Sequence, residues 1–102
     1  MATYTIRPIA EQELDQYAQH IAEDNLSAGL RLYDAAEETY HNLADFPNMG
    51  EKYISSNPLL ANVHYFPIKG FKNYFVFYQP SDNGIEIIRI INRSRNIKNI
   101  LK

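Results

Sequence analysis

Apolar and polar positions follow two different periods along this chain, and the change of period predicts its secondary structure. "TYTIR" (3–7) alternates residue by residue with β-branched and aromatic side chains, which is typical of a strand, and Pro8 ends it. From residue 9 the spacing lengthens to three or four, which predicts an amphipathic helix over 9–23. Its apolar face consists of Leu14, Tyr17, Ala18 and Ile21. Its solvent face is expected to consist of Glu11, Gln12, Glu13, Asp15 and Gln19.

A second helical pattern follows the break at "EDNLS", where Asn25 or Ser27 can cap the next helix. Pro47 and Gly50 in "FPNMG" are expected to stop this helix, and the stretch 51–62 after it has no period and is expected to be irregular. The two apolar stripes should pack against each other as a helical hairpin. The stripe of the second helix consists of Leu32, Tyr33, Ala36, Tyr40 and Leu43.

The second half of the chain has the pattern of β-strands. "VHYFPI" (63–68), "KNYFVFYQ" (72–79) and "IEIIRII" (85–91) are rich in β-branched and aromatic residues, and "KGF" and the hairpin signal "PSDNG" separate them. The last two strands carry apolar residues at both odd and even positions, so both faces of the sheet should be covered. The helices are expected to cover one face and a binding partner the other. The sequence therefore predicts one α+β domain over 1–102, ordered β-α-α-β-β-β. In it a small antiparallel sheet packs against an N-terminal helical hairpin, followed by a short C-terminal helix or tail.

Alternation assigns side chains of the two apolar strands to opposite sheet faces. Tyr74 and Tyr78 should share one face with Val76, while Phe75 and Phe77 point to the other. Such aromatics can stack on nucleic-acid bases, but they more often form core. In the last strand, alternation places Arg89 on the face of its neighbours at 87 and 91, so its head must reach water, a carboxylate or a phosphate.

Composition excludes several classes of function. The chain has 45% hydrophobic residues and no cysteine, which excludes disulfides and thiolate metal sites and favours a reducing cytoplasm. No run of residues is apolar enough to span a membrane. His20, His41 and His64 lack the spacing of a helical ligand pair, so neither a metal nor a cofactor is expected.

Charge is divided unevenly between the halves of the chain, although the net charge is only −2. Residues 1–51 hold ten acidic residues and two arginines, whereas residues 52–102 hold eight basic residues and two acidic ones. This asymmetry predicts a cationic C-terminal surface suited to an acidic partner or to a phosphate. A merely solvated chain end is the alternative. The candidate contacts with a target are Arg89, Arg93, Arg95 and Lys98.

Four segments together resemble the ParE branch of the RelE/ParE toxins of bacterial type II toxin-antitoxin systems. They are "AEQELDQYAQHIAEDN", "LADFPNMG", "FPIKGFKNYFVFYQPSDNGIEIIRII" and "NRSRNIKNIL", and they cover nearly the whole chain. The resemblance implies a cytoplasmic toxin with a cognate ParD-like antitoxin and growth inhibition when the toxin is unpaired. ParE-like members are associated with inhibition of DNA gyrase, so the resemblance implies a non-catalytic protein.

The RelE-like branch, which cleaves ribosome-bound mRNA, is the alternative. Metal-free RNA cleavage needs several cations and a proton donor to converge on one phosphate. Here the RelE-like reading has only Arg95 with Lys69 or Lys72, and Leu101 stands about where a tyrosine is expected. The ParE-like interpretation is therefore the leading one, and direct nucleic-acid binding stays open.

Two substitutions leave a third hypothesis, a degenerate member that survives only as a binding protein. Asn92 replaces a frequent histidine and Asn96 replaces an aspartate of the family pattern. An antitoxin is expected to lie across the sheet and the helical hairpin. Its candidate contacts are Tyr74, Phe75, Phe77 and Tyr78.

Overall fold

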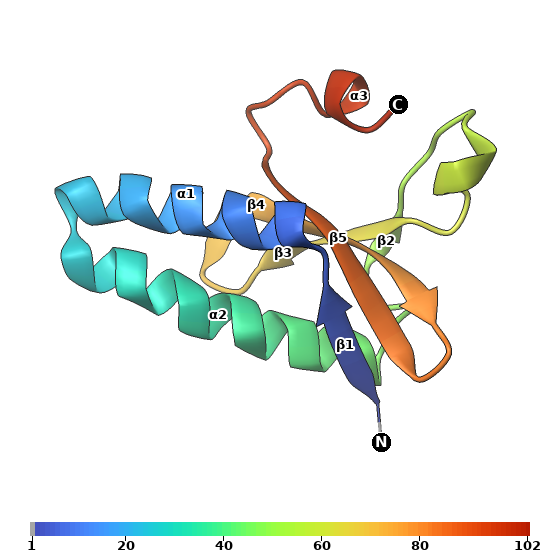
Figure 1. Cartoon of the computed structure of the whole chain (residues 1–102), viewed down its shortest axis with the longest axis horizontal. Helices are drawn as coiled ribbons and strands as arrows, with labels where there is room; N and C mark the ends of the chain where they lie inside the picture. Colours follow the sequence, from blue (N-terminus) through green and yellow to red (C-terminus); the bar gives the residue numbers. More distant parts are fainter. Residues whose placement is uncertain (1) are drawn as a thin grey trace.

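A computed structural model describes residues 2–102 as a two-helix hairpin lying against one face of a curved sheet (Figure 1). The α+β class and the order of the predicted elements are confirmed. The elements are β1 (Thr3–Ile6), α1 (Pro8–Asp24), α2 (Leu26–Asp45), β2 (Glu51–Lys52), a 3-10 turn (Pro58–Leu60), β3 (His64–Ile68), β4 (Phe71–Ser81), β5 (Gly84–Asn92) and α3 (Ile97–Ile100).

The sheet has five strands in the order β1-β5-β4-β3-β2. β3, β4 and β5 pair antiparallel, as expected, and β2 also pairs antiparallel with β3, but β1 pairs parallel with β5, from Thr3 opposite Gly84 to Ile6 opposite Ile87. The sheet is therefore mixed, because α1 and α2 together return the chain to the far edge before β2 begins. The stretch predicted as irregular begins with β2, which pairs with β3.

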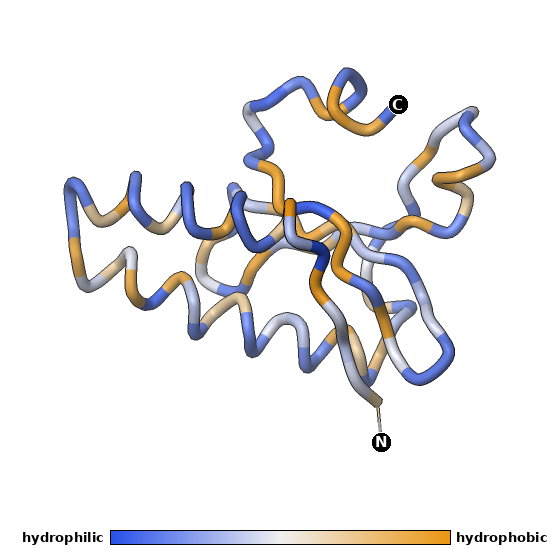
Figure 2. Tube along the Cα trace, in the orientation of Figure 1, coloured by the Kyte–Doolittle hydropathy of each residue, from blue (hydrophilic) through white to orange (hydrophobic). Residues whose placement is uncertain are grey.

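The hairpin of α1 and α2 is joined by a single residue. Asn25 is the cap of α2, and its side chain accepts a hydrogen bond from the backbone N–H of Ala28 at 3.0 Å. Gly29 allows the two helices to come close, because a Cβ there would lie 2.7 Å from the carbonyl oxygen of Ala18. Hydrophobic residues recur at every turn of both helices (Figure 2). Their buried side chains pack with those of Val76, Tyr78 and Ile87 on the facing side of the sheet, and this cluster is called the first core.

A β-bulge in β5 determines which of its isoleucines lie in the first core and which lie in a second core on the other face of the sheet. Phe77 pairs with Arg89 but Tyr78 pairs with Ile87, so one residue of β5 has no partner on β4. Ile87 and Ile90 therefore lie in the first core, under the helices, while Ile88 and Ile91 lie in the second, on the opposite face. Strict alternation, which placed Arg89 on one face with Ile87 and Ile91, was wrong because the bulge shifts the register by one residue.

Glu13 of α1 binds the bulge directly. Its carboxylate accepts hydrogen bonds from Nε and Nη2 of Arg89, at 3.0 and 2.8 Å, and from the backbone N–H of Ile90 at 3.0 Å. Both side chains are mostly buried, with 23% of the Arg89 side chain and 15% of the Glu13 side chain exposed. The carboxylate also raises the pKa of Arg89, chiefly through the hydrogen bond. The expectation that Glu13 lies on the solvent face of α1 was wrong, because this contact turns it toward β5.

We expect Glu13→Gln to lower the free energy of unfolding by about 1–3 kcal/mol, because a neutral amide cannot accept all three N–H groups and leaves a cation half-buried. Urea unfolding followed by circular dichroism measures the change. Glu23→Gln, at an exposed position of the same helix, should change it by less than about 0.5 kcal/mol. Equal effects of the two substitutions would show that the contact with the bulge adds nothing to stability.

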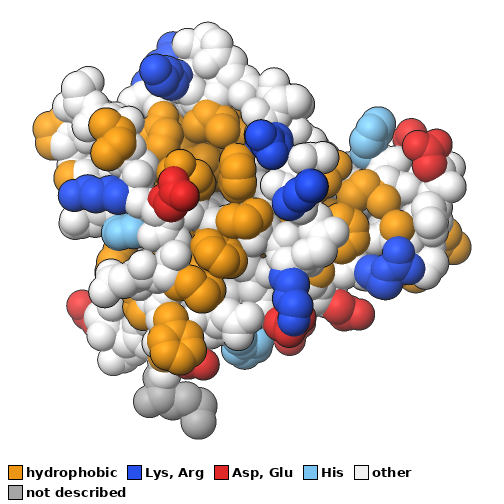
Figure 3. All heavy atoms as spheres, turned by 180° about the vertical axis from the view of Figure 1, so that it is seen from behind, with side chains coloured by type: hydrophobic (Ala, Val, Ile, Leu, Met, Phe, Trp, Pro, Cys, Tyr) orange, Lys and Arg blue, Asp and Glu red, His pale blue; other side chains and the backbone are white. Residues whose placement is uncertain are grey.

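The second face of the sheet is covered by the chain itself rather than left open for a partner. Val63, Phe77, Ile88, Ile91 and Leu101 form a buried cluster there. Seen from behind, apolar side chains gather in the middle of this side of the molecule, with lysine and arginine side chains around them (Figure 3). The C-terminal segment thus replaces much of the cover that the sequence analysis assigned to a partner.

Candidate functional site: the cationic C-terminal segment

The C-terminal segment, residues 93–102, leaves β5 through a turn that Asn92 organises. The Asn92 side chain accepts a hydrogen bond from the Ser94 N–H at 2.9 Å, and its backbone oxygen accepts one from the Arg95 N–H at 2.9 Å. The backbone N–H of Asn92 donates to the Tyr17 hydroxyl on α1 at 3.0 Å. Asn92 therefore has a structural role that a neutral amide performs well.

Apolar anchors fix the other end of the segment. Leu101, at 8% exposure, lies in the second core, and Ile97 and Ile100 of α3 pack against it. The Tyr53 hydroxyl donates a hydrogen bond to the Leu101 carbonyl at 3.1 Å, and the Asn57 side chain donates to the carbonyl of the last residue. The segment is consequently packed at both ends, which limits the freedom of the cationic side chains between them.

Three of the four predicted target contacts lie together on this segment. Arg93, Arg95 and Lys98 are exposed, and none of the ion pairs found among residues 2–102 involves them. Arg89 does not belong to this group, because its guanidinium is bound to Glu13. Arg93, Arg95 and Lys98 are called the cationic segment below. Among the ion pairs of residues 2–102, none has to break when an acidic partner binds these three side chains.

The lysines of the alternative RNA-cleaving set lie differently. Lys69, in the turn between β3 and β4, binds α2: its Nζ donates to Glu38 at 3.0 Å and its backbone N–H donates to the Thr39 hydroxyl at 3.1 Å. The segment that carries Arg95 packs on the opposite sheet face. Lys72 is exposed near the start of β4. Lys69 is therefore held on the helix side of the sheet, whereas Arg95 belongs to a segment on the opposite side.

The four predicted antitoxin contacts divide into two pairs. Phe77 and Tyr78 are 1% and 0% exposed, so they offer no surface to a partner in this structure. The Tyr78 hydroxyl donates to the Pro47 carbonyl at 2.7 Å and accepts from the Gly50 N–H at 3.0 Å, which fixes the chain after α2. Tyr74 and Phe75 are half-buried and remain available. The assignment of the four aromatics to two faces by alternation is confirmed.

An exposed apolar stripe on α2 was not found from the sequence. Leu26 and Leu30 are 67% and 60% exposed, and Tyr33, one turn further, is 38% exposed. Their spacing of three and four residues places them on one helical face. The only signal in the sequence was that Leu26 and Leu30 fall outside the stripe that packs on α1. Clustered exposed apolar residues of this kind favour a protein interface.

No helix among residues 2–102 is long and apolar enough to cross a membrane. No group of histidine, aspartate and glutamate side chains in the same range is placed to hold a metal ion.

The structure thus defines a class, a small α+β domain whose cationic C-terminal segment packs across the sheet face away from a helical hairpin. The sequence matches the family described as the ParE toxin of type II toxin-antitoxin system, parDE, over residues 4–97. The chain therefore belongs to the ParE toxin family, as the resemblance implied.

Solved structures agree with this fold. A chain of the structure described as "Chromosomal ParDE TA system from P. aeruginosa" has a TM-score of 0.71 and 18% sequence identity to this chain, and the match covers 90% of this chain and 96% of that one. No curated protein sequence matches this chain. At this identity the likeness establishes the fold and leaves contacts and targets to experiment.

We expect Asn92→Ala to loosen the turn that carries Arg95. Loss of one side-chain hydrogen bond should cost about 1 kcal/mol and speed amide hydrogen exchange at Ser94 and Arg95, which NMR measures residue by residue. Asn92→Asp should preserve the slow exchange, because a carboxylate accepts the same bond. Asn96→Ala is the matched control, since the Asn96 side chain makes no capping bond to α3. Equal acceleration by Asn96→Ala would contradict the role given to Asn92.

Proposed function

We propose that this ParE-family toxin acts without catalysis by binding and inhibiting DNA gyrase through its cationic segment. The observation that carries this proposal is that Arg93, Arg95 and Lys98 are exposed on a segment packed at both ends. A segment ordered before binding loses less conformational entropy when a partner binds. Three cations on a fixed surface suit an acidic protein surface, and guanidinium groups bind carboxylates in a bidentate manner.

The endonuclease alternative finds less support. Cleavage needs cations and a proton donor around one phosphate. Lys69 is occupied by Glu38 on the helix side of the sheet, while the cationic segment lies on the opposite side. Position 101, about where the resemblance places the tyrosine of RelE-like members, is a leucine that is 8% exposed and lies in the second core. These positions favour binding over phosphodiester chemistry.

Arg95→Ala should weaken inhibition of gyrase supercoiling by about tenfold or more, because one charge-assisted contact is lost. It should shift the melting temperature by less than about 2 °C, since the side chain is exposed. Supercoiling assays with purified gyrase measure the first effect and thermal unfolding the second. Arg31→Ala, an exposed arginine on α2, is the matched control and should leave inhibition unchanged. A toxin that leaves supercoiling intact but stops cell-free translation would replace this proposal with the endonuclease.

A ParD-like antitoxin is the second part of the proposal. The solved ParDE system with the same fold supports it, and so does the exposed apolar stripe of α2, Leu26, Leu30 and Tyr33. A flexible antitoxin segment that folds on binding can cover such a stripe and reach the half-buried Tyr74 on the helix side of the sheet, whereas contact with Phe75 requires it to extend to the opposite face.

Induction of this chain alone in a bacterial host should stop growth, and co-expression of the short open reading frame beside its gene should restore growth. Leu26→Asp/Leu30→Asp should remain toxic but lose rescue, because buried carboxylates oppose an apolar contact. Growth curves and co-purification read the two effects separately. A chain that never inhibits growth in such a test is the degenerate binding member.

A further inference from the structure

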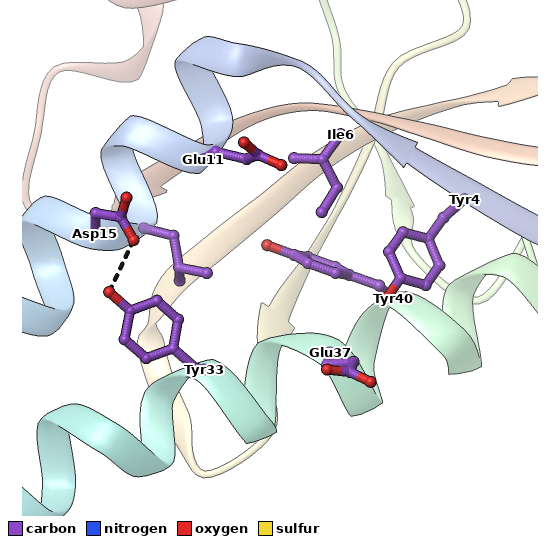
Figure 4. Close-up of a pocket in the computed structure, with 8 residues that line it drawn as sticks. Tyr4, Ile6, Glu11, Asp15, Tyr33, Glu37 and Tyr40 are labelled. Atoms are coloured by element: carbon purple, nitrogen blue, oxygen red, sulfur yellow. Dashed lines mark hydrogen bonds between the residues drawn. The ribbon is translucent and has the colours of Figure 1, made fainter.

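A cleft between β1, α1 and α2 lies on the helix side of the sheet, opposite the face on which the C-terminal segment packs, and is lined in part by acidic side chains (Figure 4). Its volume is about 290 Å³, near the lower end for small-ligand sites. Apolar side chains, Ile6 and Leu14, form part of its wall. The polar groups of its wall come from Tyr4, Glu11, Asp15, Tyr33, Glu37 and Tyr40.

The charges of the cleft are uncompensated within its wall. Three carboxylates, Glu11, Asp15 and Glu37, contribute to the wall, and its residues, all within the described range 2–102, include no lysine, arginine or histidine. The His41 ring lies 3.9 Å from Glu37 and 5.1 Å from the Tyr4 ring at the outer margin, but its side chain is 62% exposed. All three carboxylates are exposed, and a cation that binds between them gains favourable Coulomb energy.

A buried hydroxyl without a partner points into the same cleft. Tyr40 is 3% exposed, and its hydroxyl is the one buried side-chain oxygen or nitrogen without a hydrogen-bond partner that is found among residues 2–102. Figure 4 shows this hydroxyl reaching from α2 into the space beside Glu11 and Tyr33. Burial, with smaller effects of Tyr4 and Glu11, raises the pKa of Tyr40, so the hydroxyl is protonated at neutral pH. An orphaned buried hydroxyl is costly, and a ligand can satisfy it.

The spacing of the acidic side chains favours a larger cation over a metal ion as the ligand of this cleft. In residues 2–102 no three acidic or histidine side chains converge closely enough to hold a metal, so the carboxylates of the cleft are spread along it. Asp15 is moreover partly occupied, because it accepts a hydrogen bond from the Tyr33 hydroxyl at 2.8 Å. Glu11 remains for the ligand, Glu37 shares its carboxylate with His41 Nε2 at 3.9 Å, and the tyrosine rings and apolar side chains can contact an aliphatic stem.

We propose that this cleft binds an organic cation with a short aliphatic stem, an alkyl-guanidinium or alkyl-ammonium group whose head lies against Glu11 and Glu37 and hydrogen-bonds the Tyr40 hydroxyl. The group can belong to a free diamine-like molecule or to an arginine or lysine side chain of a partner. The inference does not depend on the cellular target of the toxin, since none of the cleft residues belongs to the cationic segment.

Three ligands test the proposal by NMR titration of the full chain. Agmatine represents the free cation, N-acetyl-arginine methylamide the protein side chain, and N-acetyl-citrulline methylamide its neutral isostere. We expect saturable shifts of cleft amides with at least one of the two cations and none with the citrulline compound. Tighter binding of agmatine assigns the site to a free amine, and equal or tighter binding of the arginine compound assigns it to a partner's side chain. The absence of saturation by either cation at about 10 mM overturns the proposal.

Substitutions that remove charge distinguish binding of the cation in the cleft from nonspecific attraction of the cation to acidic surface residues. Glu11→Gln/Glu37→Gln should weaken binding of the cation by about tenfold or more without lowering the melting temperature, because both side chains are exposed. Tyr40→Phe, which keeps the ring in the core, should also weaken binding. Glu23→Gln/Asp24→Asn removes two charges from the exposed end of α1 and should leave affinity unchanged. Unaltered affinity in the first double variant, or an equal loss in the control, overturns the proposal.

Discussion

The three hydrogen bonds that Glu13 accepts at the β5 bulge are the contact on which the two sides of this protein depend. The bulge changes which isoleucines of this strand lie in each core, and at the bulge Arg89 and the N–H of Ile90 meet Glu13 of α1. A half-buried guanidinium and an unpaired amide are both costly unless a partner accepts them. One carboxylate on α1 satisfies both, which joins the helical hairpin to the central part of the sheet.

The second core explains why a cationic chain end is ordered at all. Ile91 reaches the far sheet face because of the bulge, and there it joins Ile88 and meets Leu101 of the C-terminal segment. Burial of that leucine and of the flanking α3 side chains holds down a segment whose charges otherwise favour solvent. The one-residue register shift in β5 thus sets the packing of Ile91 in the second core, and this core in turn fixes the segment that carries Arg95.

Periodicity was sufficient for the two long helices and for four of the five strands, but it missed β2 and the contacts that join the elements. The helical stripe with Leu14 and Ala18 and the alternation of Phe75 and Phe77 report burial averaged over a whole element, so they could be predicted. A bulge changes no residue type, so no pattern marks it in "IEIIRII". The position of Glu13 was likewise hidden, because a glutamate beside a polar helical face has the same pattern whether it meets water or Arg89. Parallel pairing of β1 depends on where the hairpin returns the chain, which is a tertiary property.

The division of charge in the sequence becomes a division in space. The acidic first half forms the hairpin and the cleft that Glu11 and Glu37 line, while the cationic segment crosses the other side of the sheet. Surfaces of opposite sign on opposite sides attract different partners, and neither needs to displace the other. The two sides are joined by the Glu13 contact at the bulge and by the hydrogen bond from the Asn92 N–H to the Tyr17 hydroxyl, and no residue of the cleft takes part in either contact. The fold therefore favours two independent sites over one extended surface.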